Sequence, residues 1–181
     1  MADFLCHIIR RQVKLTGMRL NYLDGICENS ALKLLEACSS LDKLDSIHLN
    51  SNKSWFESEA IVEKVCELFA NCDKIKNIEF SSHMSSDASR KMISAMRTSP
   101  SHQTFDTLYL SYWNWDDDVA VEELANLLAT APNMSYTYLY NQQGKESIQA
   151  EISAAFVKVK RAGSLISQVE RSNDKNIKCY T

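Results

Sequence analysis

The segment Leu44-Asp-Ser-Ile47-His-Leu49-Asn50 decides the fold. Its first two apolar residues are three positions apart, and from Ile47 onward apolar and polar residues alternate. The same form, apolar-x-x-apolar-x-apolar, returns in Ile75-Lys-Asn-Ile78-Glu-Phe80-Ser81. Alternation with a period of two is typical of a β-strand with one buried face and one wet face. Each segment therefore predicts a short strand whose polar side chains meet water.

Working outward, the chain contains five copies of this segment, which predict an internal repeat. The copies begin at Leu15, Leu44, Ile75, Phe105 and Met134, at intervals of 29 to 31 residues. Apolar residues at helical spacing follow each copy; in the fifth unit they are Ile148, Ile152, Ala155 and Val159. A constant period of this length is typical of repeat architectures. We expect five strand–helix units.

The polar strand positions restrict how these units pack. Alternating strands and helices indicate a parallel sheet. Helices on both faces of that sheet would bury Ser46, His48, Asn77 and Glu79, at about 1 to 3 kcal/mol for each unpaired group. All helices are therefore expected on one face. The predicted fold is a right-handed β-α solenoid of about five repeats, with its parallel sheet on the concave face.

Residues that accept hydrogen bonds from a first helical turn predict where the helices start. They are Ser30, Ser58, Ser86 or Asp87, and Asp118. The acids Asp116 to Asp118 are expected to cap a helix rather than to hold a cation. We divide the chain into an N-terminal cap over 1–14, the repeat array over 15–162, and a C-terminal cap or tail over 163–181.

The repeat resembles leucine-rich repeats, and its period with a full helix per unit resembles the ribonuclease-inhibitor-like, intracellular subtype. The resemblance covers about Leu15 to Val159. The family's asparagine, three places after the last strand hydrophobe, is matched by Asn52 alone, and Thr137 stands where a core hydrophobe is expected. The resemblance implies a horseshoe that binds a protein partner on its concave face, an implication by analogy since a fold does not fix a function.

Composition excludes several other function classes. The 181 residues carry a net charge of −3 and only four glycines, so neither a nucleic-acid surface nor a phosphate-cradling loop is expected. We expect no signal peptide, no membrane-spanning segment, and a cytoplasmic, reducing location. The six cysteines form no Cys-x-x-Cys pair and are predicted to be reduced and mostly buried. No cofactor and no metal are predicted.

The alternate strand positions that face water form a candidate binding surface. The early strands present small and polar groups, and the late strands concentrate aromatic ones, which are common anchors at protein interfaces. The candidate partner-binding residues are Arg19, His48, Glu79, Tyr109, Tyr112, Trp115, Tyr136, Tyr138 and Tyr140.

The alternative for these aromatic residues is that several pack in the core, Trp113 above all. Trp55 and Phe56 either plug the edge of the core or form a second contact on its rim.

The sequence favours a non-catalytic protein–protein interaction module, an adaptor, with no catalytic residues. One alternative is a structural subunit of a larger assembly. A less favoured alternative is a hydrolase built from Ser46, His48 and Glu79. A flat, wet sheet offers such a set neither an oxyanion hole nor exclusion of water.

Overall fold

The computed structural model describes residues 2–12, 14–21, 26–50, 55–140, 154, 168–173 and 176–180. One seven-stranded sheet has the strand order β1-β2-β3-β4-β5-β7-β6. Its first five strands are parallel to one another. They are β1 (Gly17–Asn21), β2 (Ser46–Asn50), β3 (Asn77–Met84), β4 (Thr107–Trp113) and β5 (Tyr136–Tyr140).

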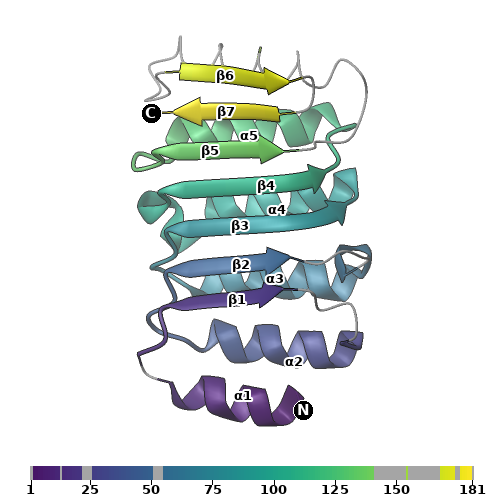
Figure 1. Ribbon diagram of the computed structural model, residues 1–181, viewed down its shortest axis with the longest axis vertical. Coiled ribbons are helices and arrows are strands. Elements are labelled where there is room, and N and C mark those ends of the chain that lie inside the picture. Colours follow the sequence, from purple (N-terminus) through teal and green to yellow (C-terminus); the bar gives the residue numbers. More distant parts are fainter. Residues whose placement is uncertain are drawn as a thin grey trace.

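Helices alternate with these strands. The α-helices are α1 (Ala2–Arg11), α2 (Glu28–Ser39), α3 (Glu59–Asn71), α4 (Ser86–Thr98) and α5 (Asp118–Thr130). Two short 3-10 helices, η1 (Trp55–Glu57) and η2 (Pro100–Thr104), join the longer elements. In Figure 1 the helices α3 to α5 lie behind the sheet, α2 lies next to β1 at the sheet edge, and α1 lies beyond α2 at the end of the row.

The strand register matches the alignment of the five sequence copies. Met18 lies opposite Ile47, Ile47 opposite Ile78, Ile78 opposite Leu108, and Leu108 opposite Thr137. Each of these residues occupies the same place in its own unit. The internal repeat therefore sets the pairing, because one-face burial fixes the register of a strand.

Burial confirms that the described helices cover one face of the sheet. Ile47 and Phe80 are fully buried on the helix side, whereas Ser46 and His48 are half-buried. The side chain of Glu79 keeps 34% of its surface exposed. A carboxylate with that much contact with water is not enclosed under a helix, so the other face of the sheet is open.

Aromatic residues fill the middle of the core. The Phe80 ring lies 6.0 Å from the Phe56 ring and 6.1 Å from the Phe69 and Trp113 rings, measured between centroids. Trp55 and Phe56 are buried, which confirms that they plug the core edge. Trp113 is fully buried, as the core alternative predicted. Its ring stacks on that of Trp115.

The cysteines follow their expected pattern in part. Cys6 and Cys72 are free and buried, Cys66 is free and half-buried, and Cys27 is free but exposed. The predicted burial is thus confirmed for Cys6 and Cys72, holds in part for Cys66, and is wrong for Cys27.

Three of the four predicted helix starts need correction. Ser58 caps α3 as expected, accepting a hydrogen bond from the Ile61 amide. The caps of α4 and α5 are Ser85 and Asp117, where Ser86 or Asp87 and Asp118 were predicted. Helix α2 begins at Glu28 after Cys27, whose side chain makes no capping hydrogen bond, so Ser30 lies inside the first turn. Adjacent Ser and Asp residues compete for one cap, and only the path of the preceding loop decides between them.

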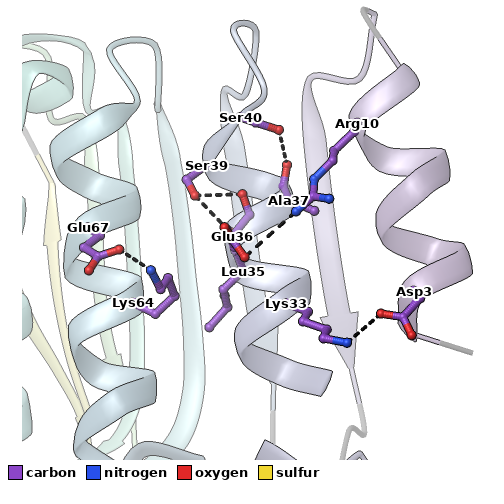
Figure 2. A network of polar contacts seen from close by, with 10 residues as sticks. All are labelled: Asp3, Arg10, Lys33, Leu35, Glu36, Ala37, Ser39, Ser40, Lys64 and Glu67. Carbon is purple, nitrogen blue, oxygen red and sulfur yellow. Dashed lines mark hydrogen bonds and ion pairs between the residues drawn. The ribbon is translucent and has the colours of Figure 1, made fainter. Parts of the chain in front are cut away.

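Both ends of the array differ from the repeating units. Helix α1 packs beside α2, with Asp3 paired to Lys33 at 2.7 Å and Arg10 to Glu36 at 3.9 Å (Figure 2). At the other end β7 (Asn176–Tyr180) pairs antiparallel with β5, and β6 (Gln168–Asn173) pairs antiparallel with β7. The sequence predicted a cap or tail here without these strands. The helical residues expected in the fifth unit, from Ile148 to Val159, lie outside the described residues, apart from residue 154.

The α/β class with a five-stranded parallel sheet is confirmed. Strand order and burial do not test the expected horseshoe curvature, which stays a prediction. Across the described ranges, no helix combines the length and the apolar character needed to cross a membrane.

Candidate functional site

A row of functional side chains crosses the open face from strand to strand. Arg19 lies opposite His48, His48 opposite Glu79, Glu79 opposite Tyr109, and Tyr109 opposite Tyr138. All five were predicted from the sequence as candidate binding residues. Strand pairing brings them together because equivalent positions of neighbouring parallel strands lie about 4.8 Å apart.

The first half of the row is a polar cluster. Nδ1 of His48 lies 2.6 Å from Oε2 of Glu79, and Nη2 of Arg19 lies 3.7 Å from the same oxygen. Oγ of Ser46 lies 3.2 Å from Nε2 of His48. With the ring proton on Nδ1 donated to Glu79, Nε2 of the neutral ring accepts from the Ser46 hydroxyl. These contacts fix the orientation of the imidazole.

The second half of the row belongs to a group of five half-buried tyrosines, which we call the tyrosine patch. Its members are Tyr109, Tyr112, Tyr136, Tyr138 and Tyr140. The Tyr138 ring lies 4.9 Å from Tyr109, 6.3 Å from Tyr136 and 5.8 Å from Tyr140, and Tyr112 lies 6.4 Å from Tyr140. These spacings fall in the range of favourable aromatic pairs. The patch is therefore one connected aromatic surface with Tyr138 at its centre.

Burial tunes the chemistry of the patch at Tyr109. Removal from water raises the pKa of the Tyr109 phenol, and the neighbouring Tyr138 and Glu79 raise it further. The hydroxyl is thus neutral at physiological pH and can both donate and accept a hydrogen bond. Such a surface combines an apolar ring with a polar tip, as interface residues commonly do.

An irregular strand end separates Tyr112 from the two tryptophans that follow it. Tyr112 has a φ of 64°, in the left-handed region that non-glycine residues rarely adopt. The pairing of β3 with β4 also shifts register between Ser81 and Met84. The alternation of β4 breaks at this point: Ser111 is buried, Tyr112 is half-buried, and Trp113 is buried.

Trp115 requires a correction, because it was expected on the binding surface. Its side chain is fully buried and stacks on Trp113 at 5.7 Å. The left-handed residue turns the chain so that both indoles enter the core. Periodicity along the strand could not predict this reversal, since it assumes regular extended backbone.

His83 extends the patch and was missed by the sequence reasoning. Its exposed ring lies 5.1 Å from the ring of Tyr112. In the sequence it occupies the turn position three places after Phe80, where the repeat pattern favours asparagine. The extension of β3 to Met84 carries His83 up to the neighbouring strand.

Within the described residues, no group of three or more His, Cys, Asp or Glu residues is placed to hold a metal ion. A hydrolase would also need backbone amides beside Ser46 as donors to an oxyanion, and the nearest ones are already used. The amides of Asp45 and Ser46 both donate to the carbonyl oxygen of Thr16, at 2.6 and 3.1 Å. These backbone donors are therefore occupied by the sheet.

No protein-family model and no curated protein matches the chain. Several solved structures are similar to it, and two of them are described here. The tropomodulin C-terminal domain from Caenorhabditis elegans has 10% identity and a TM-score of 0.60, with 90% of this chain and 99% of that chain covered. Leiomodin-1 actin-binding site 2 has 13% identity and a TM-score of 0.56, with 90% and 93% covered. At these identities the likeness concerns the fold alone.

These findings overturn the resemblance to ribonuclease-inhibitor-like leucine-rich repeat proteins. The two structures named above are a tropomodulin C-terminal domain and actin-binding site 2 of leiomodin-1. The resemblance was wrong because a segment of the form apolar-x-x-apolar-x-apolar indicates a strand with one buried face and does not identify a family. Any parallel array with helices on one side needs the same pattern, and only one unit carried the subtype's asparagine.

Proposed function

We propose that the chain is a non-catalytic protein-binding domain whose contact surface is the tyrosine patch. The observation that carries the proposal is the contiguity of five half-buried tyrosine rings on the open face. Tyrosine supplies large contact area at low entropic cost, and tyrosines are enriched among residues that dominate binding energy. The adjacent cluster of Arg19, His48 and Glu79 provides polar contacts at the rim.

Actin is the first partner to test. One similar structure is actin-binding site 2 of leiomodin-1, and the likeness spans 90% of this chain. The proposal for this chain rests on that shared fold together with the tyrosine patch. The cytoplasmic location expected from the sequence is consistent with such a partner.

Binding to purified monomeric actin tests the proposal, with the dissociation constant measured by thermophoresis. Replacing Tyr138 by alanine should weaken binding by about tenfold or more, because Tyr138 contacts three other rings of the patch. Asn77→Ala, on the same face but outside the patch, is the matched control and should retain binding. No binding to actin contradicts this partner. Equal affinities of wild type and Tyr138→Ala contradict the patch.

A hydrolase remains the second candidate, favoured by one specific observation. Ser46, His48 and Glu79 form a continuous chain of contacts in the order of nucleophile, base and orienting acid. The amides nearest Ser46 are already donated to Thr16, which leaves the developing oxyanion without backbone donors there. Activated esters test this candidate: turnover that is lost in both Ser46→Ala and His48→Ala would establish it.

Two further expectations stay part of the proposal. The sequential strand order supports right-handed coiling of the β-α units into a solenoid, as crossovers between parallel strands are almost always right-handed. The role of structural subunit in a larger assembly stays an alternative prediction.

A further inference from the structure

In the described part of the chain, exposed large apolar side chains form one group on α1, and one more lies alone on α5. Among the described residues, the large hydrophobic side chains classed as exposed are Phe4, Leu5, Ile8 and Val119, at 67%, 38%, 37% and 50% exposure. The first three lie on α1, and Val119 lies at the start of α5. Exposed apolar side chains that cluster mark interaction sites more often than scattered ones do.

On α1 the exposed apolar residues form a ridge that points away from α2. The opposite side of the helix is occupied, because Cys6 is buried and Asp3 and Arg10 pair with residues of α2 (Figure 2). Phe4 and Ile8 are one helical turn apart, and Arg11 follows on the same side. Among the described residues no acidic group lies within ion-pair distance of Arg11. The ridge is thus apolar at one end and positively charged at the other.

Val119 lines a groove on the outer surface of the helix layer, between α3, α4 and α5. The groove has a volume of about 760 Å³, and small side chains, Cys66, Ala70, Ser94 and Ala95, line much of it. Burial raises the pKa of the Cys66 thiol to about 11, so this side chain is uncharged at neutral pH. The lining therefore suits an apolar ridge.

The charges around the groove complement those of α1. Glu67 is paired with Lys64 and Glu123 with Arg97, whereas Glu63 has no cation within ion-pair distance in the described part of the chain. The α4 wall carries two cations that are already paired: Arg90 with Asp87 and Asp117, and Lys91 with Glu59 and Asp87. The carboxylate that remains available for an incoming cation is that of Glu63.

The spacing of these features agrees as well. Ala70 follows Glu63 by seven positions on α3, and Arg11 follows Phe4 by seven positions on α1. Both intervals span about 10 Å at the helical rise per residue. A helix laid antiparallel to α3 would place Phe4 over Ala70 and Arg11 beside Glu63.

We propose that α1 of one copy of this chain docks into the α3–α4–α5 groove of a second copy. The two surfaces are different parts of the molecule, so the contact is heterologous and can repeat from copy to copy. One ten-residue helix makes a small interface, and we expect association at protein concentrations on the order of 100 micromolar. The proposal does not depend on the tyrosine patch.

Sedimentation velocity over a concentration series tests the proposal. The mass of the wild-type chain should rise with concentration, and Phe4→Glu and Ala70→Glu should each abolish the rise. An equimolar mixture of these two variants should form a one-to-one dimer and nothing larger, because it contains one intact ridge and one intact groove. Ala129→Glu, an exposed change on α5 outside the groove, should behave as wild type.

Charge exchange provides a second measurement. Arg11→Glu and Glu63→Arg should each weaken association, and the two changes in one chain should restore it. Circular dichroism melts show whether each variant is folded, and Phe4, Ala70 and Ala129 are all exposed in the monomer. A wild type that stays monomeric up to about 1 mM overturns the proposal. So does an Ala70→Glu variant that still dimerises, which would indicate pairing of α1 with α1.

Discussion

Replacing Ser101 by alanine tests how neighbouring units are held together. Ser101 is fully buried in η2, and its hydroxyl serves the loop of the preceding unit twice. It donates to the carbonyl oxygen of Cys72 at 2.6 Å and accepts from the amide of Ile75 at 2.9 Å. The alanine variant leaves both backbone groups without this partner in a buried site.

The expected loss follows from the cost of those two groups. An unpaired buried donor or acceptor costs about 1 to 3 kcal/mol, so for two groups we expect the free energy of unfolding to fall by about 2 to 6 kcal/mol. With a urea slope of about 2 kcal/mol/M, the midpoint of unfolding should fall by about 1 to 3 M. The slope itself should not change, since the variant exposes no additional surface on unfolding.

Urea unfolding followed by circular dichroism measures this effect against a matched control. Ser135 also bonds to the preceding unit, through the carbonyl and the carboxylate of Asp106, but it is exposed. Ser135→Ala should therefore cost about 0.5 kcal/mol or less. If Ser101→Ala is as stable as Ser135→Ala, the buried bonds do not hold the units together and the reasoning fails.

Trp113→Ala should lower the free energy of unfolding by about 3 to 5 kcal/mol, because the indole is fully buried; an unchanged urea midpoint would contradict its place in the core. At pH 8 iodoacetamide should label Cys27 well before Cys66. A hydrogen bond with Ser30 lowers the pKa of the Cys27 thiol, whereas burial raises the pKa of the Cys66 thiol to about 11. Peptide mass spectrometry measures the two labelling rates, and equal rates would refute this. Asp117→Ala should cost about 1 kcal/mol through loss of the α5 cap, against almost nothing for Asp116→Ala, and thermal melts of the two variants check the difference.

The repeat was predictable because burial on one face leaves a direct trace in sequence. The alternation around Ile47 and Ile78 predicted which side chains enter the core, and the pairing of those two residues follows from it. The row of Arg19, His48, Glu79, Tyr109 and Tyr138 could likewise be listed, because equivalent positions of paired strands must be neighbours.

Departures from regular backbone were not predictable. The left-handed conformation of Tyr112 moved Trp115 from the expected surface into the core, and one-residue shifts moved the caps to Ser85 and Asp117. Periodicity describes an average conformation, so a single residue outside that conformation leaves no trace in it. The family assignment failed for a related reason: the pattern encodes burial, which several parallel arrays share.

By itself the sequence determined the five-strand parallel sheet, its register and its open polar face, because each depends on which side chains avoid water. Only the tertiary structure decided the antiparallel strands β6 and β7 beyond β5, the depth of Trp115, and the groove between α3, α4 and α5. These features depend on how distant segments meet. Such contacts are selected by shape and by backbone geometry, and a pattern of polar and apolar residues records neither.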